Sequence, residues 1–204
     1  MPELFPLGPT PTDAEVQSFV DGYAGPPWNE RNDPERMRKY LASYREAGAV
    51  ALGMREAGHE PYLYTHIKVY DGVDRLIEDE FTGPNAFYQT TDPEIVSEAL
   101  AGQEKVCYVS NVNADKNVPV DERLKPRLKE FSTIIDSCFN RYGASCVTYF
   151  THPETGVYRA TDEVYLPGYD IQKTYFPVKP SEHNDIEKLV LVVLTPKATE
   201  APAN

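Results

Sequence analysis

Two stretches near the C-terminal end decide the fold class, YDIQKTYFPV at residues 169–178 and IEKLVLVVL at residues 186–194. Both are rich in the β-branched and aromatic residues that favour strands. With further strands expected at 144–151 and 157–166, they predict a meander of three or four antiparallel strands. These strands are grouped at the end of the chain and do not alternate singly with helices. The sequence therefore predicts an α+β fold with an antiparallel sheet and not a doubly wound fold.

Three more strands and four helices are expected around and before this meander. Residues 62–70 alternate between aliphatic and aromatic or polar side chains, and Asp71-Gly72 is typical of a type I′ turn that leads into 73–81. A short strand follows at 105–112. The first helix begins at a capping box, Thr12 to Glu15. The expected helices share apolar residues at helical spacing and lie at 12–24, 33–57, 91–102 and 126–142.

The pattern favours a single domain with two irregular ends. Four prolines among residues 1–11 predict an extended N-terminal arm. Residues 12–196 form the single α+β domain, in which 12–58 are a helical extension. Residues 197–204 are small and polar and are expected to be a disordered tail.

Charge and composition exclude several classes of partner. The 204 residues carry a net charge of −12, which argues against a nucleic-acid partner and against docking on anionic lipid. The longest apolar run, Leu189–Leu194, is far shorter than the roughly 20 residues of a membrane helix. The chain also begins without the layout of a secretion signal, and its three cysteines have no paired spacing. We expect a cytoplasmic protein with reduced thiols and no membrane insertion.

Tyrosine is unusually frequent, with fourteen residues against one tryptophan. A strand face rich in tyrosine can line a half-polar pocket for a small ligand, although the same residues also suit a partly exposed sheet face. A histidine on such a face can move protons near neutral pH, and a strand arginine can bind a carboxylate or pair with an acidic neighbour. The candidate ligand-binding residues are Tyr62, Tyr64, His66, Tyr149, Arg159 and Tyr175. No metal-ligand or nucleotide-binding spacing is present, and the sequence identifies no cofactor.

The order of the elements, with the phrase Glu98-Ala-Leu-Ala-Gly102 after the hairpin, resembles sensory domains of the PAS and Cache type. The resemblance covers residues 33–112 and 143–196. It implies an antiparallel sheet of five or six strands with helices on one side and a small ligand between the layers. It also implies a homodimer through the N-terminal helices.

We therefore predict a small-molecule-binding sensory or regulatory module without chemistry of its own. Two alternatives stay open. One is a metal-independent enzyme that uses general acid–base catalysis on a small anionic or aromatic substrate, with His66 as base, Tyr64 or Tyr149 as donor and Arg159 as anion clamp. The other is a structural or assembly protein.

Overall fold

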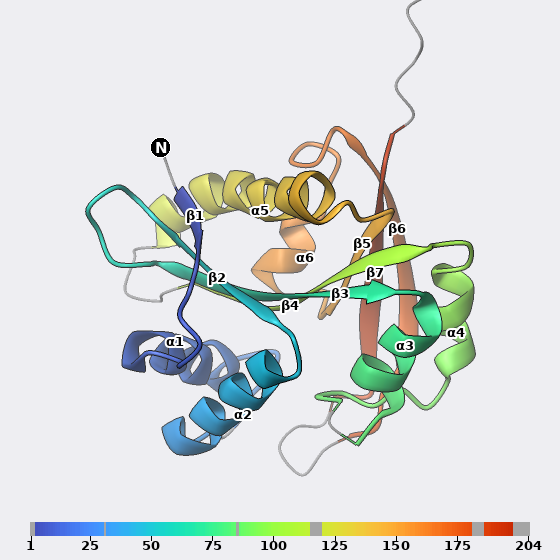
Figure 1. Cartoon of the computed structure of the whole chain (residues 1–204), viewed down its shortest axis with the longest axis horizontal. Coiled ribbons are helices and arrows are strands. Elements are labelled where there is room, and N and C mark those ends of the chain that lie inside the picture. The colour runs from blue at the N-terminus through green and yellow to red at the C-terminus, as the bar shows by residue number, and fades with distance from the viewer. Residues whose placement is uncertain (1–2, 31, 85, 115–119, 181–185, 198–204) are drawn as a thin grey trace, which may run out of the picture.

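A computed structural model describes residues 3–30, 32–84, 86–114, 120–180 and 186–197 (Figure 1). Within these ranges the strands form one seven-stranded sheet in the order β1-β2-β3-β4-β5-β7-β6. The strands are β1 (Glu3–Pro6), β2 (Val50–Arg55), β3 (Leu63–Asp71), β4 (Lys105–Ala114), β5 (Cys146–Thr151), β6 (Tyr169–Pro177) and β7 (Lys188–Pro196). The helices are α1 (Asp13–Ala24), α2 (Pro34–Glu46), α3 (Val73–Ile77), the π-helical turn η1 (Glu78–Thr82), α4 (Pro93–Ala99), α5 (Val120–Tyr142) and α6 (Gly156–Ala160).

The sheet is mixed, and this corrects the predicted five- or six-stranded antiparallel sheet. β4 and β5 run parallel, while every other neighbouring pair in the described sheet is antiparallel. The long helix α5 connects β4 to β5, and a parallel pair needs such a crossover to return the chain to the same end of the sheet. The predicted C-terminal meander is also wrong, because β7 lies between β5 and β6, whereas β1 to β4 pair antiparallel in chain order.

Helices cover both faces of the sheet and not one face as predicted. In Figure 1, α5 and α6 lie on one side of the sheet, and α1, α2, α3 and α4 lie on the other. Three clusters of buried side chains fill the spaces between these layers. The first packs α5 on the sheet through Phe131 and Ile134, the second contains Leu76 of α3 and Val96 of α4, and the third contains Phe19 of α1.

The second predicted helix, 33–57, is too long. Asp33 does cap α2, since its side chain accepts hydrogen bonds from the backbone of the first turn. The helix ends at Glu46, and Gly48 then adopts a left-handed conformation with φ of +93°. Residues 50–55 form β2, which pairs with both β1 and β3. Its apolar residues satisfy helical spacing but are buried on both sides within a sheet.

Two predicted strands are not strands. Residues 73–81 fold into α3 and η1, with Leu76 and Phe81 fully buried against the sheet. Residues 157–166 begin within α6, which Thr155 caps by accepting a hydrogen bond from the Tyr158 backbone N–H. The predicted helices at 12–24 and 91–102 are confirmed as α1 and α4, and the Thr12 hydroxyl accepts from the Glu15 N–H at 3.2 Å.

The apolar side chains of α1 and α2 pack against each other and against the sheet of the same chain. Phe19 and Leu41 are fully buried and pack with Tyr64 of β3. The predicted tail lies almost entirely outside the described residues. In the described ranges no helix combines the length and the apolar character needed to span a membrane.

Candidate functional site

The sheet divides at its parallel pair. β4 and β5 pair over only three residues each, and the last pair is Tyr108 with Thr148. Beyond it β4 continues beside β3, and β5 continues beside β7. The described parts of the two strands make no further pairs with one another, so a fork opens between them. A cavity of about 440 Å³ occupies this fork.

The cavity passes through the sheet. Successive residues of a strand point to opposite faces. Val109 and Tyr149 belong to the cluster under α5, whereas Tyr108 and Phe150 belong to the cluster on the α3 and α4 side. All four line the cavity. The space is therefore open to both layers of helices.

One end of the cavity, on the α1–α4 side, is enclosed by aromatic rings. These rings form what we call the aromatic box, and they are Tyr23, Trp28, Tyr40, Phe87, Tyr88 and Tyr108. Adjacent rings are in contact, with centroid separations of 5.7 Å between Tyr23 and Trp28, 5.6 Å between Trp28 and Tyr88, and 5.0 Å between Phe87 and Tyr88. Such edge-to-face and tilted contacts fix the position of each ring.

A buried carboxylate, Glu80 of η1, lines the cavity beside this box. Its Oε1 atom accepts hydrogen bonds from the Tyr44 hydroxyl at 2.9 Å, the Lys68 ammonium at 2.9 Å and the Tyr70 hydroxyl at 2.5 Å. Burial and the nearby Glu80 charge raise the pKa of both phenols, so they stay protonated and donate. This network gives one oxygen of the buried Glu80 carboxylate three donors.

The Tyr108 hydroxyl also lies in the cavity. It has no hydrogen-bond partner within the part of the chain that the structure describes. Burial raises the pKa of Tyr108 well above its usual value, and the charge of Glu80 raises it further. The group is therefore a neutral donor located where β4 and β5 separate.

The other end of the cavity is lined by β5, α6 and the turn between them. The Thr151 and Thr155 hydroxyls share a hydrogen bond of 2.6 Å. Arg159 donates to the Glu154 carbonyl oxygen at 3.1 Å and is the sole basic residue among the described residues that line the cavity.

The six predicted ligand-binding residues do not come together. Tyr149 and Arg159 line the cavity, and Tyr62, Tyr64, His66 and Tyr175 do not. The Tyr149 hydroxyl is hydrogen-bonded to Thr161, Tyr62 donates to Glu130 on α5, and Tyr64 is buried under α1 and α2. Tyr175 is 49% exposed on β6, beside Lys188.

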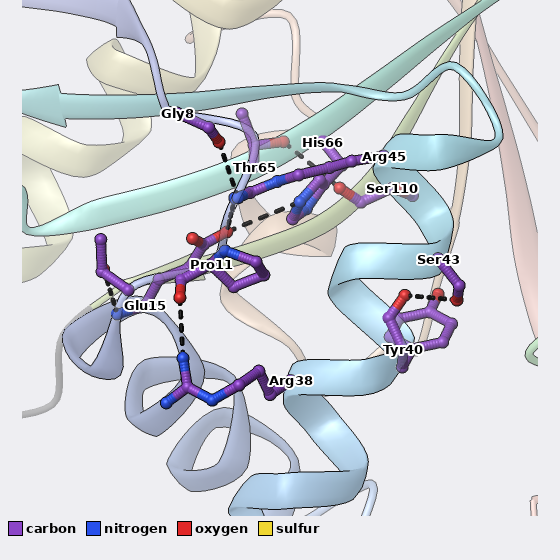
Figure 2. Close-up of polar contacts among 11 residues, drawn as sticks. Gly8, Pro11, Glu15, Arg38, Tyr40, Ser43, Arg45, Thr65, His66 and Ser110 are labelled. Atoms are coloured by element: carbon purple, nitrogen blue, oxygen red, sulfur yellow. Dashed lines mark hydrogen bonds and ion pairs between the residues drawn. The ribbon is translucent and has the colours of Figure 1, made fainter.

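His66 lies inside a separate buried cluster with Glu15 and Arg45, drawn in Figure 2. Its Nε2 atom is 3.6 Å from Glu15 Oε1, which also pairs with the Arg45 guanidinium. Burial and the Arg45 charge lower the pKa of His66 to about 3. The ring is fully enclosed and neutral, and it does not reach the cavity.

Sequence reasoning missed Glu80 and the aromatic box. Glu80 belongs to residues 73–81, which the sequence analysis predicts to be a strand. Its spacing of four residues from the buried Leu76 was the signal that the segment is helical and that Glu80 points the same way. Trp28, Phe87 and Tyr88 lie in connecting segments, where no periodicity indicates which way a side chain points.

Known structures share this architecture. The N-acyl amino acid synthase FeeM from uncultured soil microbes superposes with a TM-score of 0.57 at 13% identity, covering 96% of this chain and 91% of its own. The putative acetyltransferase yncA from Salmonella typhimurium, solved with its cofactor acetyl-CoA, gives 0.53 at 13% identity over 99% and 98%. The AHL synthase LasI gives 0.52 at 11% identity over 96% and 89%.

The chain has the N-acetyltransferase (GNAT) fold. No protein-family model matches the sequence, and no curated protein matches it significantly. The resemblance to PAS and Cache domains is wrong, because the GNAT fold has a mixed sheet with helices on both faces. The interpretation as a sensory module without chemistry is overturned with it, since the solved proteins that share the GNAT fold are acyltransferases.

Proposed function

We propose that this protein is an acyltransferase that moves an acyl group from an acyl-coenzyme A thioester to an amine. The observation that carries the proposal is the cavity in the fork between β4 and β5, which reaches both faces of the sheet. The fold supports it, because yncA, which shares the fold, has acetyl-CoA as its cofactor.

The chemistry needs an activated acyl carbon and a stabilised negative charge. The thioester supplies that carbon when bound: a C–N bond to the amine forms, the C–S bond breaks, and the proton lost by the amine ends on the thiol. Tyr108 is placed to donate a hydrogen bond to the charge that develops during this exchange. Because its raised pKa keeps it protonated, it stabilises by donation and does not give up its proton.

The fork also fits the narrow, amide-containing arm that carries the thioester. Beyond Tyr108, the backbone groups of β4 that face β5 have no strand partner in the described residues. Such groups need hydrogen-bond partners when buried. An extended chain with its own amide groups can supply them, as an added strand does.

The two ends of the cavity suit different parts of the reaction. On the α5 and α6 side, beside the polar turn that leads into α6, the lining includes the apolar residues Leu63, Val109, Phe131 and Val157. We place the acyl group there, and we expect the site to prefer an acyl group larger than acetyl, because burying each additional CH₂ contributes about 0.8 kcal/mol.

Two glycines provide a matched test. Gly156 lines the cavity and Gly168 does not, and at each a side chain would meet open space. We expect Gly156→Phe to reduce amide formation from octanoyl-coenzyme A and a panel of primary amines about tenfold or more. Gly168→Phe should retain the wild-type rate. Amide is measured by mass spectrometry, and the absence of any amide from the wild-type protein would refute the proposal.

Two finer expectations remain part of this proposal. The first is that the protein is cytoplasmic. Cys107, Cys138 and Cys146 are all free and buried, which suits a reducing compartment, and acyl-coenzyme A would be available to the protein there. A homodimer through α1 and α2 is the second expectation, and sedimentation of the purified protein tests it.

A further inference from the structure

One oxygen of the buried Glu80 carboxylate is committed, and the other is available. Oε1 receives all three hydrogen bonds described above, whereas Oε2 accepts none from the described residues. The residue is only 7% exposed, and it lines the cavity. A carboxylate oxygen can accept up to two hydrogen bonds. Oε2 keeps accessible surface and Glu80 lines the cavity, so a donor of a ligand in the cavity can bind this oxygen.

The cation that neutralises Glu80 does not occupy the cavity. Lys68 binds Oε1 and lies over the Tyr44 ring, 4.1 Å from its centroid. Neither Lys68 nor Tyr44 is among the residues that line the cavity. The Lys68 ammonium thus lies outside the cavity wall, whereas the Glu80 carboxylate is part of that wall.

The rings next to Glu80 favour the same kind of ligand. The faces of tyrosine and tryptophan rings carry negative potential and attract cations, most strongly when water is excluded. The box combines several such rings in mutual contact, including Trp28 and Tyr88 at 5.6 Å. The cavity's one described basic residue, Arg159, lies on α6 and donates to the Glu154 carbonyl oxygen. The part of the cavity lined by the aromatic box and Glu80 therefore favours a ligand that carries a positive charge on an apolar group.

We propose that the acceptor is a primary amine attached to an aromatic or similarly apolar group, which binds as its ammonium between Glu80 Oε2 and the rings of the aromatic box. The ammonium loses one proton to solvent before its nitrogen attacks the thioester, and the second proton ends on the thiol. The inference rests on the proposed function only in calling this ligand the acyl acceptor. Tyr108 is both a wall of the box and the last paired residue of β4, so the amine nitrogen is placed beside the fork.

Trp28 makes the binding step measurable without any thioester. It is the chain's sole tryptophan and it lines the box, so its fluorescence reports on occupancy. Titration of the wild-type protein with phenethylamine, 2-phenylethanol and 3-phenylpropionate compares a cation, a neutral molecule and an anion of similar size. We expect phenethylamine to bind about tenfold more tightly than either of the others, which corresponds to one charge-assisted hydrogen bond.

A pair of variants assigns the preference to one carboxylate. Glu80→Gln keeps the shape and an acceptor oxygen for the tyrosines but removes the charge, and it should reduce the preference for the amine to about twofold or less. Glu130 is the matched control: it is buried, accepts from the Tyr62 hydroxyl and does not line the cavity. Glu130→Gln should keep the full preference.

The outcomes separate this inference from the proposed function. Equal or tighter binding of 2-phenylethanol to the wild-type protein overturns the inference, and this comparison needs no variant to fold. Unchanged preference in Glu80→Gln also overturns it. If phenethylamine binds with the expected preference but no thioester yields an amide, the amine site stands and the acyltransferase proposal fails.

Discussion

Tyr108 and His66 illustrate how position decides the chemistry of a side chain. Both lie on neighbouring central strands and both are almost fully buried. Tyr108 faces a cavity with a hydroxyl that has no partner among the described residues, whereas His66 is enclosed beside Glu15 and Arg45. The first is therefore available to a ligand, and the second is enclosed under α1 and α2, where its ring contacts Phe19 and Tyr44.

Substitution of the Tyr108 hydroxyl should affect turnover and not stability. Tyr108→Phe removes a donor that we place at the charge developing in the transition state, so kcat and kcat/KM should fall together by about 10- to 100-fold. Since the hydroxyl has no internal partner, the Tm should stay within about 2 °C of the wild-type value. Steady-state kinetics and thermal unfolding measure the two effects. A large loss of Tm with unchanged kcat would contradict this role.

The buried His66 makes stability depend on pH. Its folded pKa of about 3 lies below the 6.5 of the unfolded chain, so only the unfolded state takes up a proton between these values. Stability should therefore fall as the pH drops from 6.5 towards 3, by up to about 1.4 kcal/mol per pH unit. Burial raises the pKa of Glu15, which stabilises the folded state at low pH and opposes part of the loss.

The contribution of His66 to the pH dependence of stability is obtained by comparing a variant without the histidine with the wild-type protein. We expect His66→Leu to show a weaker decline of unfolding free energy between pH 6.5 and pH 4.5 than the wild-type protein, in urea titrations at each pH. His59 is exposed in the segment between β2 and β3, and His59→Leu is the control that should retain the wild-type pH dependence. Identical slopes for His66→Leu and the wild type would show that the histidine is protonated in the folded state.

At the scale of elements, α1 approaches the fork more closely than any side chain permits. A Cβ atom on Gly22 would lie 2.2 Å from Oδ1 of Asn113, which extends from β4. Alanine in place of glycine within a helix normally stabilises a protein by about 1 kcal/mol. Here the gain competes with a steric conflict at the wall of the cavity.

A double-mutant cycle separates these two effects. Gly22→Ala alone should be neutral or destabilising, because Asn113 must move. In the Asn113→Ala background the same change should stabilise by about 1 kcal/mol, as in an unobstructed helix. Urea unfolding of the four proteins gives the coupling energy. An equal gain in unfolding free energy in both backgrounds would show that the Asn113 side chain does not obstruct a Cβ atom at position 22.

Local signals predicted the elements that depend on local chemistry. The caps at Thr12 and Asp33 and most strands were identified correctly because capping and strand composition are properties of a few adjacent residues. The errors at 50–55 and 73–81 arose where an apolar spacing suits two structures. β2 pairs on both sides, and α3 packs Leu76 on the sheet; these tertiary contacts decide the outcome.

At the scale of the whole molecule, the site could not be predicted from neighbouring residues. Its walls come from the end of α1, the segment around Trp28, η1, the fork strands and α6, which are distant in the sequence. Tyr149 and Arg159 were selected as members of tyrosine-rich strands, and only the crossover through α5 sets β5 beside β4. The cavity exists because β4 and β5 run parallel and pair over only three residues. No local sequence pattern encodes the direction in which two strands pair.

The short contact between β4 and β5 also has a mechanical meaning. In the described chain, β4 and β5 join the half-sheet β1–β4 to the half-sheet β5–β7 through three residue pairs, and one more backbone hydrogen bond, from Ser145 N–H to the Lys105 carbonyl oxygen at 2.7 Å, lies directly before β5. Beyond these pairs the two halves are joined by side chains, through the clusters that contain Ile67 with Val190 and Tyr108 with Leu191. We expect a molecule bound between β4 and β5 to supply partners for their unpaired backbone groups and so to slow amide hydrogen exchange in both halves of the sheet.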